Sequence, residues 1–518
     1  MGCNSTTENR SKDNVFRYNE HKNISSLDPA FAKDNANIWA VNQLFNGLVQ
    51  MDNDMKITPC IASSWEISNN GTLYTFHLRS DVYFHKHEGF GPERTRTVVA
   101  EDFVYSFKRL LDTKVASPGS WVFNQVESFN ALNSNTLEIK LQQPFPAFLG
   151  LLTMKYCSVV PREIIEHSSQ NFRSHPIGTG PFVFKAWSEN NKLVFRKNTN
   201  YFERDRNGKK LPYLEAVAIT FLPDKQSEYL QFIQGNLDFV SGLDASYKDD
   251  VLKSNGELND NYQGVFQMKK APYLNTEYLG FFMDSELNEI QSKTLRKAFN
   301  YGFNRQKMID YLRNGIGIPG HGGFIPKGLA GYNDSIGYSY DPKKAKQLIE
   351  QFKNDTGIRN PSLTISTNEN YLSFCEFIQR SLVDVGLEIK IDVMPASALK
   401  SAKANGKTDV FRASWVADYP DAQNYLSLFY SKNFAPNGPN YTHFKRNEFD
   451  TLYDLASKQN EDSLRVDLYQ KMDRLVIDEA PFAVLFYDEV VRFVQNNVEG
   501  LGVNATNLLD LKRVKKSK

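Results

Sequence analysis

From about residue 271 onward, short strand patterns alternate with longer amphipathic helix patterns. The helix patterns cover residues 294–311, 342–353, 371–385 and 463–479, and the clearest strand patterns cover 388–393 and 483–487. Strands that alternate with helices of this length are typical of layers in which helices cover a sheet. The second half of the chain is therefore predicted to be an α/β lobe.

The first 270 residues contain more strand. Residues 64–67 and 72–78 lie on either side of Asn69-Asn70-Gly71, which is a hairpin signal because Asn and Gly tolerate positive φ. Residues 100–112 predict an amphipathic helix with acids at its start and bases near its end, as the helix dipole favours. This half is predicted to be mixed α and β.

One hydrophobic core cannot hold this chain. It has 518 residues, whereas single cores stop growing at roughly 250–300 residues, so two or three lobes are expected. The net charge of +1 gives no electrostatic reason to expect nucleic acid as a partner. The basic C-terminal run at 512–518 is interpreted as a frayed, solvated tail.

Motifs of catalysis and metal binding are missing from the sequence. The four cysteines form no C-x-x-C pair, and Cys60, Cys157 and Cys375 are expected to be buried apolar residues. His85 and His87 are interpreted as surface histidines at a strand end, because no third metal ligand is evident. The sequence has neither G-x-S-x-G nor H-E-x-x-H. We expect no enzymatic activity, no metal and no cofactor.

The segment 414–421 contains the most distinctive group of residues. Asp418 stands beside Trp415 and Tyr419 at the junction of a strand and a turn. A carboxylate that loses water in a closing cleft needs a cationic partner, which points to a ligand that carries an amine. The alternative is that Asp418 only organises the turn that follows it. Asp421 is predicted to be the N-cap of a helix over 422–430.

Short stretches along nearly the whole chain resemble the bacterial ABC-transporter extracellular solute-binding proteins of family 5, which bind oligopeptides and dipeptides. The matching stretches are 26–29, 44–49, 62–67, 74–79, 100–109, 176–182, 295–300, 341–345 and 414–421. Each stretch is weak alone, and their number and order carry the resemblance. Membership of this family is therefore expected.

The resemblance implies a periplasmic-binding-protein-like, two-lobe flytrap of type II with an additional α+β domain. Residues 1–14 would be a flexible tether, and lobe I would be discontinuous. The implied ranges are 15–45, 172–268 and 484–518 for lobe I, 46–171 for the additional domain (domain II), and 269–483 for lobe III. Val416 stands where some relatives have a disulfide cysteine, so that disulfide has no counterpart here.

The resemblance also implies a ligand-binding set. Its members are Asp418, Trp415, Arg412, Ala417, Tyr419, Ile24 and Ser25. Asp418 would hold the α-ammonium group of a peptide, Arg412 could meet its carboxylate end, and Trp415 would form the wall of a side-chain pocket. Ile24 and Ser25 would offer main-chain groups to the peptide. A structural role for Arg412 or Trp415 is the alternative.

Two interpretations of the N-terminus compete. Met1-Gly2-Cys3 is either the remnant of a lipoprotein cleavage site, with lipid on Cys3, or a myristoylation pattern. We favour the first, since the rest of the chain resembles bacterial proteins. No apolar run is long enough to span a bilayer. The expected location is the periplasm or the outer face of the cytoplasmic membrane, with a lipid anchor.

The expected function is that of the substrate-binding component of an ABC importer. It would capture oligopeptides or dipeptides between its lobes and deliver them to the membrane permease as a monomer. An oligosaccharide or a nickel chelate is an alternative ligand; a sugar would stack on Trp415 and Trp187 and would not need Asp418. A secreted hydrolase or an envelope signalling module is a second alternative.

Overall fold

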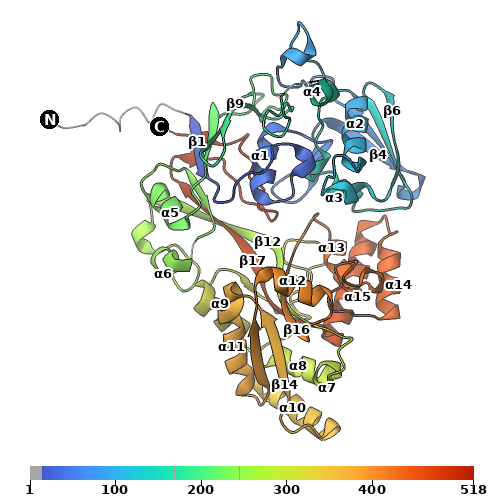
Figure 1. Ribbon diagram of the computed structural model, residues 1–518, viewed down its shortest axis with the longest axis vertical. Helices are drawn as coiled ribbons and strands as arrows, with labels where there is room; N and C mark the ends of the chain where they lie inside the picture. The colour runs from blue at the N-terminus through green and yellow to red at the C-terminus, as the bar shows by residue number, and fades with distance from the viewer. Residues whose placement is uncertain (1–13, 168–169, 244, 518) are drawn as a thin grey trace, which may run out of the picture. The chain divides into compact units, whose positions relative to one another are not determined.

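The computed structural model describes residues 14–167, 170–243 and 245–517 (Figure 1). The chain forms two compact units. Unit 1 comprises Met1–Ala245, Asp260–Ala271 and Val490–Lys518, and unit 2 comprises Ser246–Asn259 and Pro272–Glu489. The chain passes between the units four times, and two of these passages lie within the long strands β12 (Phe266–Phe281) and β17 (Phe482–Gln495). The division of the chain into three lobes stays a prediction.

Unit 1 is mixed α and β. Its other strands are β1 (Val15–Asn19), β2 (Val49–Met51), β3 (Ile57–Pro59), β4 (Ala62–Ser68), β5 (Leu73–Leu78), β6 (Val126–Asn133), β7 (Thr136–Leu141), β8 (Phe182–Ser188), β9 (Lys192–Lys197), β10 (Ala216–Thr220), β11 (Phe239–Ser241), β18 (Val498–Glu499) and β19 (Lys515–Lys516). Its helices are α1 (Asn35–Leu44), α2 (Ala100–Leu111), α3 (Phe148–Leu151), α4 (Arg162–His167) and α5 (Lys225–Ile233).

The main sheet of unit 1 is built around β1, which pairs in parallel with β10 and β11. The sheet continues antiparallel from β10 to β9 and β8, and from β11 to the end of β17. Phe16 and Tyr18 of β1 are buried, and Tyr18 packs edge-on against Trp39 of α1 with ring centroids 6.2 Å apart. Aromatic contacts therefore join α1 to this sheet.

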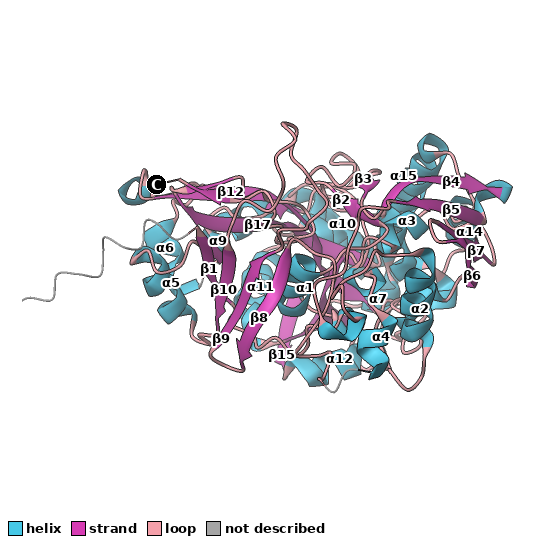
Figure 2. Ribbon diagram, turned by 90° about the horizontal axis from the view of Figure 1, so that it is seen from above, coloured by secondary structure: helices cyan, strands magenta, loops and turns pink. Residues whose placement is uncertain are grey.

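A second, antiparallel sheet has the order β4-β5-β7-β6. Helix α2 lies against one of its faces (Figure 2), where Phe107 packs 5.4 Å from Phe129 of β6. The predicted hairpin between β4 and β5 is confirmed, since Asn69, Asn70 and Gly71 have φ of 49°, 55° and 89°. Only residues that tolerate the left-handed region can make this turn.

Unit 2 is the predicted α/β assembly. Its other strands are β13 (Ile318–Pro319), β14 (Ser362–Thr367), β15 (Glu388–Val393) and β16 (Val410–Val416). Its helices are α6 (Lys248–Val251), α7 (Asn288–Gln291), α8 (Lys293–Tyr301), α9 (Arg305–Arg313), α10 (Pro342–Thr356), α11 (Leu372–Val383), α12 (Ala396–Ala404), α13 (Ala422–Leu426), α14 (Asn447–Ala456) and α15 (Asp462–Glu479).

Strand β14 pairs in parallel with β15 and β16, and β16 pairs antiparallel with β12. Apolar side chains from these strands and from the helices α8 to α11 form one core. Its members include Leu279, Phe281, Leu295, Phe299, Ile309, Ile349, Phe352, Ile365, Ile378, Leu382 and Val410. This core fixes β16, which carries Arg412 and Trp415 of the predicted ligand-binding set, together with its neighbour β12.

The single helix predicted over 294–311 is wrong. The structure has two helices, α8 and α9, separated by Gly302 and capped anew by Asn304, whose side chain accepts from Lys307 N at 3.0 Å. Gly302 is required by close packing, since a Cβ there would lie 2.4 Å from a side-chain carbon of Leu382. Similarly, the helix predicted over 422–430 ends as α13 at Leu426 and continues as a 3-10 turn.

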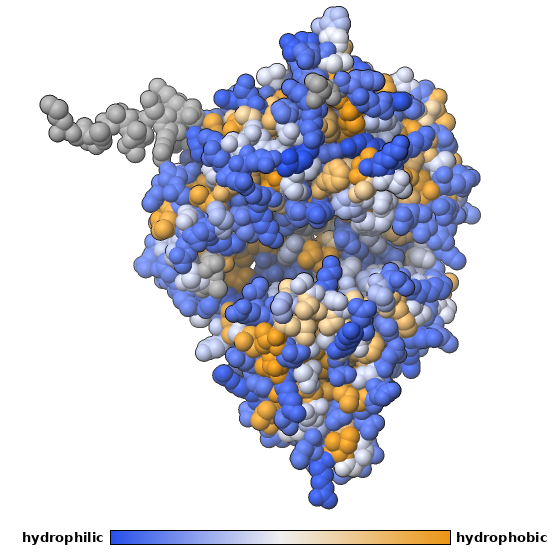
Figure 3. Space-filling view, viewed as in Figure 1, coloured by the Kyte–Doolittle hydropathy of each residue, from blue (hydrophilic) through white to orange (hydrophobic). Residues whose placement is uncertain are grey.

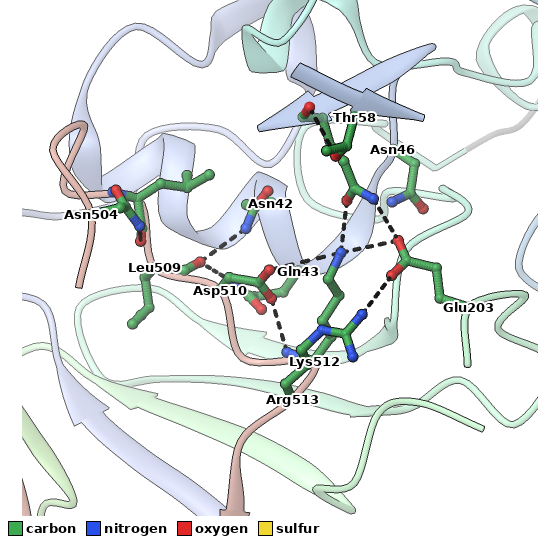
Figure 4. Close-up of polar contacts among 12 residues, drawn as sticks. Asn42, Gln43, Asn46, Thr58, Glu203, Asn504, Leu509, Asp510, Lys512 and Arg513 are labelled. Carbon is green, nitrogen blue, oxygen red and sulfur yellow. Dashed lines mark hydrogen bonds and ion pairs between the residues drawn. The ribbon is translucent and has the colours of Figure 1, made fainter. Parts of the chain in front are cut away.

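The interpretation of the C-terminus as a solvated tail is also wrong. The Lys512 side chain is 10% exposed and donates to Gln50 Oε1 at 2.7 Å and to Glu203 Oε1 at 3.0 Å (Figure 4). Strand β19 pairs with β18, and Lys516 bonds to Asp238 at 2.7 Å. Lys512 and Lys516 form ion pairs with largely buried acids, so composition alone could not place them.

Replacing Lys512 with methionine is expected to lower the free energy of unfolding by about 3 kcal/mol, because the largely buried Glu203 would lose its nearer cation and keep only the half-exposed Arg513 at 3.9 Å. Urea unfolding of the two proteins measures this difference. The control is Lys515→Met, whose ion pair with Glu499 is about half exposed and should be worth less than about 1 kcal/mol. Equal losses in the two variants would contradict a structural role for Lys512.

His85 is buried, contrary to the surface position predicted for it. Its main-chain N donates to Gly178 O at 2.7 Å, its Nε2 lies 3.0 Å from Gly180 O, and its Nδ1 accepts from Gly178 N at 3.3 Å. Only a neutral imidazole can accept at Nδ1 while donating at Nε2. The histidine therefore holds the Gly-rich turn before β8.

Burial lowers the pKa of His85 from 6.5 to about 4. As the pH falls from 6.5 toward 4, the unfolded chain takes up a proton that the folded protein excludes, so stability is lost. We expect this residue to reduce the free energy of unfolding by up to about 1.4 kcal/mol per pH unit in that window. Urea unfolding at several pH values should give a shallower dependence for His85→Gln, and parallel curves would refute the assignment.

Cys60, Cys157 and Cys375 are buried free thiols, as predicted, whereas Cys3 lies outside the described residues. Among the residues that the structure describes, no helix combines the length and apolar character needed to cross a bilayer. The face drawn in Figure 3 is predominantly hydrophilic, with scattered apolar patches.

Candidate functional site

Strand β16 brings two kinds of side chain to opposite faces of unit 2. It pairs with β12 so that Ser414 is opposite Glu277, and Trp415 is opposite Thr276. Because side chains alternate along a strand, Arg412 and Ser414 share a face with Glu277, whereas Trp415 belongs to the other face. The loop after β16 carries Asp418 and ends at the start of α13.

Asn424 of α13 organises this loop. It is 4% exposed, and its Oδ1 accepts from Trp415 Nε1 at 2.8 Å and from Asp418 N at 3.3 Å. Asp421 caps α13 by accepting from Gln423 N at 2.8 Å, as predicted. One buried amide therefore fixes both the indole of Trp415 and the backbone of Asp418. Asn424 is the third residue of α13 and no motif flanks it, so the sequence alone does not indicate its role.

The carboxylate of Asp418 is left available by this arrangement. Its side-chain contact is a long one of 3.5 Å with Asn424 Nδ2, and within the described ranges no cation lies at ion-pair distance. Asp418 is exposed to solvent, yet the protein atoms around it partly desolvate the carboxylate and raise its pKa, with the Asn424 contact opposing that shift. The site can therefore accept a cation from outside the chain.

Arg412 is held by residues of its own unit. It forms an ion pair with Glu277, and its guanidinium carbon lies 3.2 Å from the centre of the Tyr371 ring. The two charged side chains are 12% and 3% exposed. Tyr371 and Asn275 also donate to Glu277 Oε1, at 3.2 Å and 3.1 Å. Burial raises the pKa of Glu277, while Arg412 opposes that shift.

Glu277 and Tyr371 were not identified from the sequence. The available signal was an acid inside the apolar strand 274–281, which is buried along its length. Buried acids need partners, so Glu277 should have been matched with a nearby base. Arg412 Nε is buried and has no hydrogen-bond partner among the described residues.

The remaining predicted residues divide between the units. Tyr419 is buried and its hydroxyl meets Gln423, while Ala417 N donates to Leu274 O at 2.9 Å. Ile24 and Ser25 belong to unit 1, where Ile24 is buried. The main chain of Ser25 already bonds to other residues, donating to Asn37 Oδ1 at 3.0 Å and accepting from Arg173 Nε at 2.6 Å. Five of the seven residues thus lie on unit 2 within residues 412–419, with Arg412 and Trp415 on opposite faces of β16.

Other features of the described residues do not compete with this site. An open groove of about 1070 Å³ in unit 1 is lined by residues such as Leu230, Asp238, Val265 and Lys516 and contains none of the predicted set. Asp418 is a stronger candidate site than this groove, because its carboxylate has no cationic partner in the described part of the chain, lies beside a buried amide and can accept a cation. Within the described ranges, no group of three or more His, Cys, Asp or Glu side chains could hold a metal ion.

Comparison with known proteins gives consistent likenesses. The model for "Bacterial extracellular solute-binding proteins, family 5 Middle" matches residues 56–437. The dipeptide-binding protein of Escherichia coli K12 is 25% identical over 485 residues, which cover 89% of this chain and 86% of that protein. Heme-binding protein A of Haemophilus influenzae is 27% identical over 503 residues, covering 92% and 88%.

Solved structures resemble the whole chain. HbpA2 from Haemophilus parasuis superimposes with a TM-score of 0.85 at 21% identity, covering 97% of this chain and all of that one. DppA from Helicobacter pylori, in complex with the peptide STSA, gives a TM-score of 0.77 at 26% identity, covering 97% and 98%. These likenesses confirm the predicted α/β, periplasmic-binding-protein-like fold class.

Proposed function

Because this chain belongs to the bacterial extracellular solute-binding proteins of family 5, we propose that it is the substrate-binding component of an ABC importer and that its ligand is a peptide with a free amino terminus. The observation that carries this proposal is the carboxylate of Asp418, which is fixed through Asn424 and has no cation within ion-pair distance among the described residues. Relatives named as dipeptide-binding proteins support the ligand class.

Asp418 would receive the α-ammonium group in a charge-assisted hydrogen bond, which strengthens as water leaves. Trp415, held by Asn424, would offer a rigid apolar surface to a peptide side chain. Arg412, whose side chain is 12% exposed, would offer its guanidinium to a carboxylate, while Glu277 keeps it in place. Ile24, Ser25, Ala417 and Tyr419 remain proposed contacts.

The family consists of binding proteins of transporters, and we propose no catalytic step for this member. It would act outside the cytoplasm as a monomer that delivers peptide to a membrane permease. Lipid on Cys3 would tether it to the membrane. Fractionation of cells that express Cys3→Ser tests the tether, since loss of lipid should move the protein from the membrane fraction to the soluble one.

The ligand class is tested by native mass spectrometry of the purified protein, followed by denaturing release. A ladder of small masses that fragment as peptides is the expected result. A single non-peptide mass, such as a sugar or a chelate, would refute it. A relative named as a heme-binding protein makes a Soret band the optical check on the same sample.

A further inference from the structure

Unit 1 carries a basic hairpin that the proposed function does not use. Residues 204–210 contain four cations and one acid, and Arg204 bridges to Lys210 as an antiparallel pair. Arg204, Arg206, Lys209 and Lys210 are all exposed. The turn between them needs Gly208, which has φ of 77°. We call these four side chains the basic hairpin.

The acids near the basic hairpin are already bonded elsewhere. Asp205 accepts from Asn207 N at 2.8 Å, from Lys209 N at 2.9 Å and from Tyr213 Oη at 2.5 Å. Glu203, at the base of the hairpin, pairs with the buried Lys512. None of the four cations of the hairpin forms an ion pair within the described ranges. Arg204 Nη1 donates to Gly208 O at 2.8 Å, Lys210 Nζ donates to Thr199 O at 3.5 Å, and Lys209 lies over the Tyr213 ring. The four charges are therefore exposed without a neutralising acid among the described residues, on a chain whose net charge is only +1.

An open groove lies at the base of the hairpin. Its volume is about 410 Å³, and its lining includes Arg204, Lys210, Phe202 and Tyr83. Asp81 also lines it, but Arg79 binds both oxygens of that carboxylate, at 2.9 Å and 2.8 Å. A lining that combines two cations with aromatic side chains suits a phosphodiester joined to a small organic group.

The described chain begins beside this hairpin. Asn14 Nδ2 donates to Tyr213 O at 2.7 Å, and Glu215 N donates to Asn14 O at 2.8 Å. The C-terminal residues lie beside β1 as well (Figure 1), where Lys516 Nζ donates to Val15 O at 3.2 Å. A tether on Cys3 would therefore join the protein at the edge of the basic hairpin.

We propose that the basic hairpin and the groove at its base form a docking surface for anionic phospholipid headgroups of a bilayer, with one headgroup phosphate seated between Arg204 and Lys210. The reasoning from the tether rests on the proposed function, whereas the docking surface itself does not. The 11 residues from Cys3 to Asn14 can span at most about 40 Å. A tether of that length lets the hairpin reach the bilayer surface, and its charges would then act on headgroups within about 8 Å at physiological salt.

The test uses the full chain with Cys3→Ser, so that no lipid anchor contributes. Cosedimentation is measured with phosphatidylcholine vesicles and with vesicles that also contain phosphatidylglycerol. We expect binding to the anionic vesicles only, with a loss as salt increases. Each basic residue near such a surface should contribute about fivefold. The variant R204Q/R206Q/K209Q/K210Q should therefore bind at least about a hundredfold more weakly.

The matched control is K343Q/K346Q/K390Q/K400Q, which removes the same charge from exposed positions of unit 2. It should bind anionic vesicles nearly as wild type does. Within the hairpin, R204Q/K210Q should lose more binding than R206Q/K209Q, because only the first pair lines the groove. Circular dichroism and peptide binding should be unchanged in all these variants.

Four results would overturn the proposal. Equal binding to neutral and anionic vesicles would exclude headgroup charge as the cause. Equal losses in the hairpin variant and the unit 2 control would reduce the effect to net charge, and equal losses in the two hairpin pairs would exclude the seat in the groove. Binding of the hairpin to acidic peptides but not to vesicles would assign it to a protein partner instead. Failure of peptide capture, by contrast, would refute the proposed function and leave this test intact.

Discussion

Replacing Asp418 with alanine is expected to weaken the binding of a peptide with a free amino terminus by about 2–5 kcal/mol. The reason is that the ammonium group would lose its anion at a position from which the bound peptide would exclude water. Asp418→Asn should lose nearly as much, because the amide keeps the size of the side chain but not its charge. Isothermal titration calorimetry with one defined peptide measures the difference.

A chemical control makes this result specific. An N-acetylated copy of the same peptide should bind wild-type protein as weakly as the free peptide binds Asp418→Ala, and acetylation should cost Asp418→Ala almost nothing. Affinity of the wild type should also fall as the pH falls through the pKa of Asp418, since only the ionised carboxylate attracts the ammonium. A loss below about 0.5 kcal/mol in Asp418→Ala would remove this residue from the site.

Replacing Glu277 with leucine is expected to lower the free energy of unfolding by about 3–5 kcal/mol. The guanidinium of Arg412 is largely buried and would remain charged without its partner. Arg412→Met should cost a similar amount, since it leaves the carboxylate of Glu277 buried and unpaired. Urea unfolding gives the free energies, and hydrogen exchange of peptides from β12 and β16 locates the loss in unit 2.

The double variant decides whether the pair is responsible. Glu277→Leu with Arg412→Met removes both charges and fills the space with apolar atoms, so it should recover most of the stability. If the losses in free energy of unfolding of the two single variants simply add in the double variant, Glu277 and Arg412 act independently. The double variant also separates two roles of Arg412, because it should fold and yet lose any preference for a free peptide carboxylate over an amidated one.

Local patterns predicted much of unit 2 because its elements have strong periodicity and clear caps. Strand 388–393 appears as β15 with the same limits, and Asp421 caps α13 as expected. The break between α8 and α9 was missed because apolar periodicity continues across Gly302, and the reason for that glycine is a contact with Leu382, 80 residues away in the sequence. Such contacts between distant residues leave no local signal.

The candidate site shows the same limit. Asp418, Trp415 and Arg412 lie on or beside one strand, so the resemblance to a family could indicate them together. Their partners come from elsewhere in the chain: Glu277 from β12, Tyr371 from the turn before α11, and Asn424 from α13. His85 and Lys512 were misplaced for a related reason, since a polar residue looks exposed until its buried partner is known.

The order of the units along the chain has a consequence for synthesis. Most of unit 2 is one continuous stretch, Pro272–Glu489, whereas unit 1 includes Val490–Lys518. The end of β17, the β18–β19 pair and Lys512 all come from that last segment. While the chain emerges from the ribosome, unit 2 can fold first. The first two hundred or so residues must remain incompletely folded until the last strands of their sheet have been made. A truncation after Glu489 would thus make the N-terminal part of unit 1 dependent on chaperones. The residues of unit 2 that directly precede the cut would not be affected in this way.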